Sequence, residues 1–254
     1  MTVRKSSALA VGAVVCAGVL GTGCAQQAQQ SSSPGPVASG SSATRPASAR
    51  PAPPDSSVRH LPGLGPAMRA RVPDVSRQVL VVTGRTQDTG KAVAVLYERH
   101  PSQGWRSAAG PWPVHNGLRG WSHDHRVGDL RTPIGVFGLS DAGGRLPDPG
   151  TRLPYDHDPE YAIDGTGHLG EPLEGSFDYV VAIDYNRVPG TTPMDGTRPM
   201  GEDKGGGVWI HVDHGAPTNA CLSLHEDHMR ALLRALDPDK RPVVVMGPQQ
   251  VLAS

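Results

Sequence analysis

Apolar positions along most of the chain fall in short runs that are rich in β-branched and aromatic residues and bounded by Gly, Pro, Asp or Asn. This pattern is typical of β-strands. Six strands are predicted, at residues 77–85, 91–100, 135–140, 178–186, 207–212 and 241–247. The segment "TGRTQDTGK" predicts a hairpin turn between the first two. Two loops, 141–176 and 187–206, are crowded with Gly, Pro and Asp, and loops of such length are typically functional or mobile.

One helix is predicted near the C-terminal end. Ser223 and Glu226 fit the S-x-x-E capping box, and an apolar stripe follows at helical spacing before "DPDKRP" ends it. The stripe, expected to pack on the sheet, consists of Met229, Leu232, Leu233 and Leu236. A cap at Ser223 places Cys221 beside the helix N-terminus. Free backbone N–H groups and the helix dipole favour a thiolate there.

The N-terminal segment predicts export. Arg4 and Lys5 precede an apolar run and the small-residue stretch "TGC", so residues 1–24 are expected to be a signal peptide. The run is shorter than the about 20 residues that span a bilayer. "LGTGC" approximates a lipoprotein processing site, which predicts lipidation of Cys24, with simple cleavage and release as the alternative. The protein is then expected at the outer face of the cytoplasmic membrane or in the cell wall.

Residues 25–57 are rich in Ser, Pro, Ala and Gln, a composition that predicts a disordered linker. Residues 58–254 fit one folded domain with a sizeable core. The chain contains 24 Lys and Arg against 24 Asp and Glu, so charge points neither to nucleic acid nor to an acidic membrane surface. The only membrane contact expected is through the lipid anchor.

Cysteine usage directs attention to one thiol. Cys16 and Cys24 belong to the export segment, which leaves Cys221 as the only cysteine of the predicted domain. An unpaired thiol in an exported protein is either buried and inert or kept for its reactivity.

A histidine precedes this cysteine at a distance that suits catalysis. Alternation in "VWIHV" points Trp209 and His211 to one face of a strand, and a hairpin-like return reaches Cys221. Imidazole and sulfur can thus come within hydrogen-bond reach, as a nucleophile and its base require. Asp213 or a backbone carbonyl is expected to orient the imidazole. The backbone N–H groups of Ala220 and Cys221 are candidates for an oxyanion hole.

Four segments resemble the L,D-transpeptidase catalytic domain family (the YkuD or ErfK type), in order and across most of residues 75–247. They are "GPWPVHNGL" (110–118), "GDLRTPIGVFGLS" (128–140), "VVAIDYN" (180–186) and "GVWIHVDHGAPTNACLSL" (207–224). "TPIGVF" is similar to the family's T-P-x-G-x-F signature. The resemblance implies a β-sandwich with one clear helix after the catalytic cysteine, with Cys221 as nucleophile and His211 as base.

The family usually has Gly before the cysteine and often His before that, whereas this chain has Ala220 and Asn219. A methyl group matters if the backbone must approach substrate or adopt a positive φ there. The departure motivates an alternative, a catalytically impaired wall-binding module.

The resemblance further implies acyl transfer on peptidoglycan stem peptides. Cys221 would form a thioester with the diamino acid that precedes a terminal D-alanine, and a diamino-acid amine of a second stem would resolve it into a cross-link. Water as acceptor would make the same site an L,D-carboxypeptidase. No cofactor is implied, and carbapenem-type β-lactams are the expected inhibitors.

Further polar residues are candidates for orienting groups or substrate contacts. The 187–206 loop is a candidate lid that carries Arg198 or Lys204 to a stem-peptide carboxylate. Asn186 ends a strand of the resembling segments and is a candidate cleft residue, as is Asn219 beside the cysteine.

A zinc peptidase is a competing interpretation, because histidines recur in close pairs. These pairs are His123 with His125, His211 with His214 around Asp213, and His225 with His228. No HExxH pattern is present and such loose spacing arises by chance, so no metal ligand is predicted. His225 and His228 lie outside the apolar stripe and are expected on a solvated helix face.

Overall fold

The computed structural model describes residues 60–254. The predicted signal peptide, Cys24 and the predicted linker lie outside the described residues. Within residues 60–254, no helix is both long enough and apolar enough to cross a membrane.

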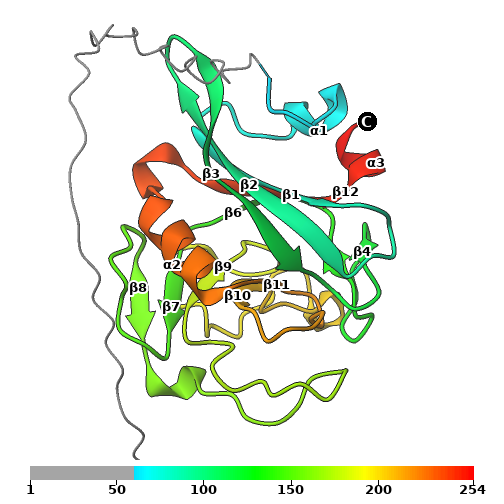
Figure 1. The fold of residues 1–254 in the computed structure, drawn as a ribbon, viewed down its shortest axis with the longest axis vertical. Helices are drawn as coiled ribbons and strands as arrows, with labels where there is room; N and C mark the ends of the chain where they lie inside the picture. The colour runs from blue at the N-terminus through cyan, green and yellow to red at the C-terminus, as the bar shows by residue number, and fades with distance from the viewer. Residues whose placement is uncertain (1–59) are drawn as a thin grey trace, which may run out of the picture. The chain divides into compact units, whose positions relative to one another are not determined.

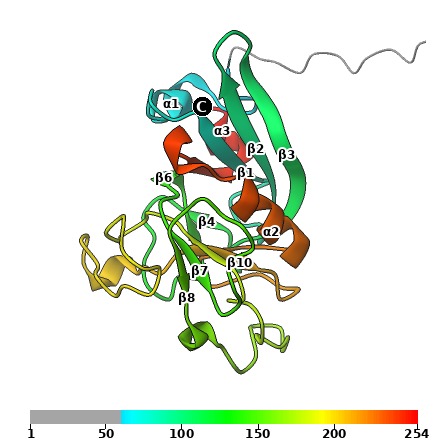
Figure 2. The ribbon, with the colours of Figure 1, turned by 90° about the vertical axis from the view of Figure 1, so that its left-hand side faces the viewer.

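Ten strands form one continuous sheet that curls around the core, as Figures 1 and 2 show from two sides. In spatial order the sheet contains β6 (Gly135–Gly138), β12 (Val243–Pro248), β1 (Gln78–Gly84), β2 (Lys91–His100), β3 (Gly104–His115), β11 (Leu222–Leu224), β10 (Trp209–Val212), β9 (Val180–Ala182), β7 (Ala142–Gly144) and β8 (Tyr155–His157). A second, two-stranded sheet pairs β4 (Trp121–Ser122) with β5 (Thr132–Pro133). The prediction of a mainly β fold is confirmed.

Every predicted strand is present, and the predicted hairpin is confirmed as well. β1 and β2 pair antiparallel with Gly84 opposite Ala92, so the chain reverses where the turn was expected. The apolar run at 178–186 is strand only over Val180–Ala182. Short helices lie before, between and after the strands: α1 (Pro66–Ala70), η1 (Pro159–Tyr161), η2 (Glu202–Lys204), η3 (Pro238–Lys240) and α3 (Gln249–Leu252).

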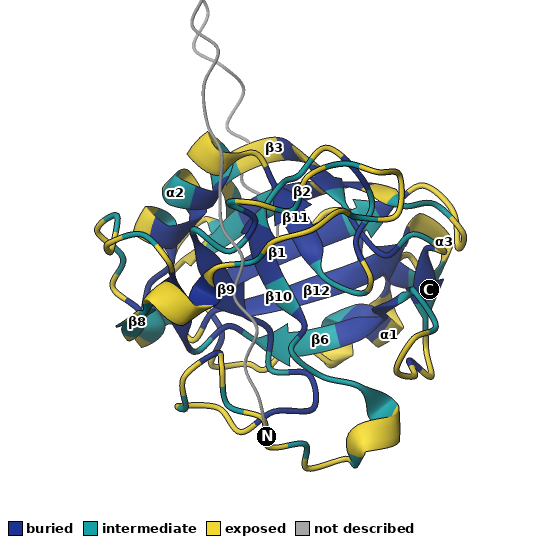
Figure 3. Cartoon of the chain, turned by 90° about the horizontal axis from the view of Figure 1, so that it is seen from below, coloured by how far each residue is buried: buried dark blue, intermediate teal, exposed yellow. Residues whose placement is uncertain are grey.

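Strands β1 and β12 lie at the centre of the hydrophobic interior and are buried on both faces. Alternate side chains join two different clusters: Leu80, Val82, Val244 and Met246 enter the larger core, whereas Val79, Val81, Val243 and Val245 pack toward α1 and α3. Double-sided burial explains why their sequences are continuous apolar runs rather than alternating ones. Figure 3 shows these strands as buried and the surrounding loops as largely exposed.

Helix α2 (Glu226–Ala235) covers the larger core with the predicted stripe. Met229, Leu232, Leu233 and Leu236 are each 0% exposed. The predicted capping box, however, is wrong. Ser223 lies inside β11, and the N-cap is His225, whose Nδ1 accepts a bond from the N–H of Asp227. Because the strand runs to Leu224, the hydroxyl of Ser223 is used elsewhere and donates to Asp213.

The longest strand, β3, was missed in the sequence. It has 12 residues and pairs with β2 along its length, with two register shifts. Gly110, Pro111 and Pro113 interrupt its apolar pattern, and most of its side chains are only partly buried. The C-terminal end of β3 pairs with β11, because His115 lies opposite Ser223. The sheet therefore places β11 directly beside β3, and β10 follows on the other side of β11.

Candidate active site

His211 lies on one strand and Cys221 lies just before the neighbouring strand. His211 belongs to β10, and Cys221 immediately precedes β11, which pairs with β10 in parallel. The return between them is therefore a short crossover, and the predicted hairpin-like geometry is wrong, although the two residues do come together. Trp209 and His211 share one face of β10, as predicted. The ring of Phe177 contacts both, at centroid distances of 5.0 Å and 5.3 Å.

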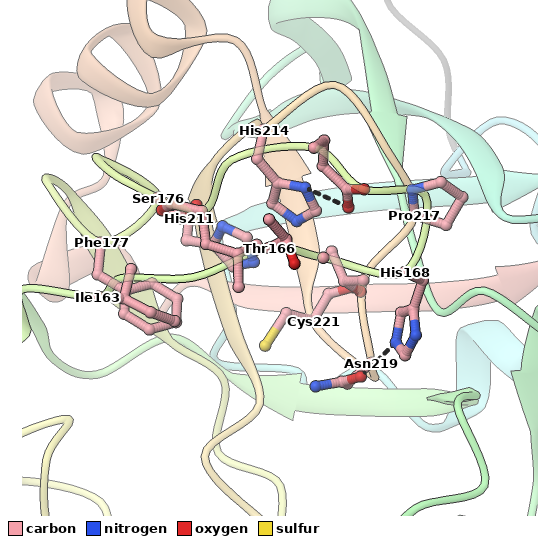
Figure 4. A pocket seen from close by; sticks show the side chains of 14 residues that line it. Ile163, Thr166, His168, Ser176, Phe177, His211, His214, Pro217, Asn219 and Cys221 are labelled. Atoms are coloured by element: carbon pink, nitrogen blue, oxygen red, sulfur yellow. Dashed lines mark hydrogen bonds and ion pairs between the residues drawn. The ribbon is translucent and has the colours of Figure 1, made fainter.

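Both side chains line one cavity of about 230 Å³. The walls come from residues 163–177 on one side and from 211–221 on the other. Figure 4 shows the sulfur of Cys221 pointing toward the middle of the pocket, below the rings of His211 and His214. Cys221 is half-buried and His211 is 3% exposed. The thiol is thus neither sealed in an apolar interior nor fully open to water.

The sulfur is held by backbone groups rather than by an imidazolium. The N–H of Trp209 donates to Sγ at 3.4 Å, and the thiol donates to the carbonyl of Gly207 at 3.6 Å. Burial raises the pKa of Cys221 to about 11, and the Trp209 N–H opposes the rise only in part. The predicted thiolate at a helix N-terminus is therefore wrong, because α2 begins beyond β11 and not at Ser223.

His211 is oriented by a backbone carbonyl. Its Nδ1 lies 2.8 Å from the oxygen of Val212, so Nδ1 carries the donated proton and Nε2 of the neutral ring is free to accept one. Burial lowers the pKa of His211 to about 4, against the opposing pull of the Val212 carbonyl. The two candidate catalytic groups are therefore both uncharged at neutral pH. Across residues 60–254 as the structure describes them, no hydrogen bond joins these two side chains.

Asp213 does not orient His211 directly. Its carboxylate accepts bonds from His115 Nδ1 at 2.8 Å and from the hydroxyl of Ser223 at 2.7 Å. These partners draw Asp213 to the face of the sheet that carries His115, and they hold its pKa below the ordinary value although burial acts to raise it. Its side chain lines a different cavity, which it shares with Lys91, His115 and residues of α2.

Two threonine hydroxyls contact the backbone carbonyl of Cys221, one from the 213–221 loop and one from the T-P-x-G segment. The hydroxyl of Thr218 donates to the carbonyl of Cys221 at 2.6 Å, and the hydroxyl of Thr132 reaches the same oxygen at 3.5 Å. Thr132 is fully buried and also accepts the N–H of Gly117 at 2.8 Å. One motif residue thus ties the cysteine to the loop after β3.

A small hairpin, residues 163–173, covers the pocket and is called the flap below. Within it, Gly167 N–H donates to the carbonyl of Glu171 and Leu173 N–H donates to that of Gly165. Two contacts join the flap to the 213–221 loop: His168 Nε2 lies 2.6 Å from Asn219 Oδ1, and Glu171 Oε1 lies 3.2 Å from His214 Nδ1. Figure 4 marks both contacts. The exposed Asn219 therefore lies at the pocket wall, where substrate contact was expected.

The flap residues were not singled out from the sequence. Their only signal was the Gly- and Asp-rich loop at 141–176, which was predicted to be functional or mobile. In the flap, His168 and Glu171 carried no motif of their own. Outside the flap, Phe177 carried none either, and His214 was considered only as a metal ligand.

The predicted 187–206 lid does not line the pocket. Arg187 anchors the loop from inside, bound to the buried carboxylates of Asp141 and Asp184 at 2.9 Å and 2.6 Å. Arg198 donates to carbonyls of its own loop, those of Asp195 and Thr197. Lys204 pairs with Asp124. The cationic side chains are therefore engaged away from the cavity.

Asn186 is a structural residue and not a cleft residue. It is 4% exposed, donates to the carbonyls of Gly201 and Gly205, and accepts the N–H of Met200. Its side chain thus shapes the 187–206 loop, and its φ of 47° shows that the backbone turns sharply there.

Ala220 creates no backbone strain. The non-glycine residues with positive φ in the part of the chain that the structure describes are Leu130, Asn186 and Arg241. Ala220 packs against the larger core. The concern that a glycine conformation is required at this position is therefore not supported.

The histidine pairs do not converge on one point. His125 lies 2.9 Å from Asp129, and His228 stacks on Trp112 with a centroid distance of 5.7 Å. His228 is consequently half-buried and not on a solvated face, unlike the exposed His225. Among residues 60–254, no group of three or more His, Cys, Asp and Glu side chains is arranged to hold a metal ion.

Comparison with known proteins assigns the chain to one family. The family model of the L,D-transpeptidase catalytic domain (YkuD) matches residues 77–245, and the chain belongs to that family. No curated protein gives a significant match. Two solved structures of the helical cell shape determining protein Pgp2 from Campylobacter jejuni, one of them a mutant, align at 18% identity with TM-scores of 0.36 and 0.37. They cover 66% of this chain, which spans 47% and 46% of theirs.

Proposed function

We propose that the protein is an exported peptidoglycan L,D-transpeptidase with Cys221 as nucleophile and His211 as general base. The observation that carries the proposal is the shared pocket of an L,D-transpeptidase domain, which is lined by a half-buried thiol and a buried neutral imidazole. A catalytic cysteine needs a base in the same cavity, and this geometry supplies one.

The first half-reaction starts from the neutral thiol of Cys221 and the neutral imidazole of His211. Sγ of Cys221 attacks the carbonyl carbon of the diamino acid that precedes a terminal D-alanine, and the S–H proton passes to Nε2 of His211. Backbone N–H groups of Ala220 and Cys221 stabilise the oxyanion. The C–N bond then breaks, His211 returns the proton to the leaving amine of D-alanine, and a thioester remains on Cys221.

The second half-reaction uses a neutral diamino-acid side-chain amine from another stem. The amine attacks the thioester, gives a proton to His211 and forms the new amide as the C–S bond breaks. The proton on His211 then restores the thiol. Water in place of the amine would give L,D-carboxypeptidase activity at the same residues.

The proposed location follows from the substrate. Export and lipidation at Cys24 would hold the domain at the outer face of the cytoplasmic membrane, with residues 25–57 as a tether toward the wall. Stem peptides are the proposed partners, and carbapenem-type β-lactams are the proposed inhibitors. Asn219 at the pocket wall is the proposed contact with the stem.

The test is product analysis with a disaccharide tetrapeptide. The proposal expects a cross-linked dimer and released D-alanine from the mature protein. Cys221→Ala should yield neither product, and His211→Ala should slow the reaction by about 10² to 10⁴-fold. Tripeptide alone would identify a carboxypeptidase instead. Binding to the wall without any turnover would identify the impaired wall-binding module and contradict the enzyme.

A further inference from the structure

The imidazole of His211 lies between two rings. Phe177 meets it edge to face at an interplanar angle of 88°, and His214 stacks on it at 11° with centroids 5.8 Å apart. A hydrogen bond from Nδ1 to one carbonyl fixes the tautomer but leaves the tilt of the ring free. The two neighbouring rings restrict that tilt, so the direction of Nε2 depends on them.

His214 is itself held by the flap. Its Nδ1 lies 3.2 Å from Glu171 Oε1, and within residues 60–254 neither of these two buried atoms has a hydrogen-bond partner. The other carboxylate oxygen of Glu171 accepts the N–H of Leu169 at 2.8 Å. Hydrogen bonds from the backbone of Glu171 and Leu169, together with the charges of His214 and His168, lower the pKa of Glu171. Glu171 is therefore an anion within the flap.

We infer that His214, braced by Glu171 of the flap, is a positioning residue that aligns the base His211. The inference rests on the proposed function. Among the residues that the structure describes, no side-chain carboxylate bonds to His211, since Asp213 is bound to His115 and Ser223. In its place, the face of a second imidazole limits the ring, and a carboxylate from the flap holds that imidazole.

The test compares four variants by the rate of Cys221 acylation with a carbapenem, followed by intact mass. His214→Ala should slow acylation about tenfold or more, because a misaligned base loses its orientation. His214→Phe keeps a stacking face but loses the contact with Glu171, so it should recover only part of the wild-type rate. Glu171→Gln keeps both rings and weakens the same contact, so its rate should also fall between those of His214→Ala and wild type. Glu174→Gln, at the next carboxylate along the chain and exposed, should match wild type.

A second readout separates positioning from damage to the pocket. Alkylation of Cys221 by iodoacetamide near the thiol pKa of about 11 requires no base. Its rate should be the same in wild type and His214→Ala if His214 acts through His211. Equal slowing of alkylation and acylation, or acylation by His214→Ala at the wild-type rate, would overturn the inference.

Nitrogen NMR of the imidazole rings gives a readout that does not depend on activity. Wild type should show His211 in one tautomer with the proton on Nδ1 and with sharp ring signals. His214→Ala should keep that tautomer, because the Val212 carbonyl fixes it, but its His211 ring signals should broaden as the tilt becomes variable, and those of His214→Phe should broaden less. If wild type forms no carbapenem adduct, the proposed function fails, and the NMR comparison still decides the positioning role. Unchanged His211 signals in His214→Ala would reject that role whether or not the enzyme is active.

Discussion

At position 221 the sulfur is satisfied as a neutral thiol, between the N–H of Trp209 and the carbonyl of Gly207. Ionisation would forfeit the second contact and place a charge in a partly desolvated pocket. The imidazole of His211 is neutral for the same reason. In the proposed reaction, the proton therefore moves during attack on the substrate, and substrate binding has to bring Sγ and Nε2 together.

Cysteine alkylation should report this neutral thiol. Because burial raises the pKa of Cys221 to about 11, the rate with iodoacetamide should keep rising as pH increases past the ordinary value near 9.0. The measurement is the rate of mass gain against pH, with Cys221→Ala as the blank. A titration midpoint below about 7.5 would show a preformed thiolate and contradict the neutral pair.

The identities of His211 and Cys221 as candidates followed from a strand motif and from a single unpaired cysteine. Their protonation states did not follow, because the burial comes from the flap and from Phe177, which are remote in sequence. The thiolate prediction also depended on a helix start at Ser223. The Ser-x-x-Glu spacing is also compatible with Ser223 as a strand residue, and in the structure Ser223 lies in β11 and donates a hydrogen bond to Asp213.

At the scale of elements, the parallel pair β10 and β11 sets the geometry of the site. The loop between them carries His214, Thr218 and Asn219, so one segment contacts the base, the cysteine carbonyl and the flap. Thr132 of β5 fixes this loop from the other side. The T-P-x-G segment therefore has a physical role beneath the cysteine, separate from any contact with substrate.

Replacing the hydroxyl of Thr132 should test that role. Thr132→Val removes the acceptor of the buried Gly117 N–H and should lower the free energy of unfolding by about 1–3 kcal/mol. It should also slow acylation of Cys221, because the carbonyl of that residue loses a contact. Urea denaturation and adduct formation measure the two effects. Thr132→Ser keeps the hydroxyl, and losses as large in this control as in Thr132→Val would show that only the methyl group matters.

The elements that the sequence missed are those with weak local signals. β11 has three residues and follows a loop, and β3 carries Gly and Pro within its length. Both are strands because neighbouring strands supply their hydrogen bonds. The 187–206 loop was mistaken for a lid, because its cations were visible in sequence while their acidic partners Asp141, Asp184 and Asp124 were not identifiable.

At the scale of the whole molecule, a curled sheet buries its central strands on both faces and leaves the site at its β9–β11 side. Continuous apolar runs predicted the central strands, and helical spacing predicted the stripe of α2. The export signal and Cys24 lie outside the described residues, so the location of the protein remains a prediction from the sequence.

The buried imidazole of His211 should make the free energy of unfolding fall at acidic pH. The pKa of His211 falls from 6.5 to about 4 on folding, so between these values the unfolded chain binds the additional proton. The free energy of unfolding that depends on a neutral His211 is therefore fully present above pH 6.5. It falls by about 3 kcal/mol as the pH is lowered toward 4. Urea denaturation against pH should show this loss in wild type and a smaller one in His211→Gln. Parallel curves for the two proteins would contradict a buried neutral His211.

The intact mass of the mature protein after incubation with a carbapenem tests directly whether Cys221 is a nucleophile. We expect one covalent adduct per chain, located at Cys221 by peptide mapping, absent from Cys221→Ala and formed far more slowly by His211→Ala. If folded wild-type protein gains no mass, or if the adduct persists in Cys221→Ala, Cys221 is not the nucleophile.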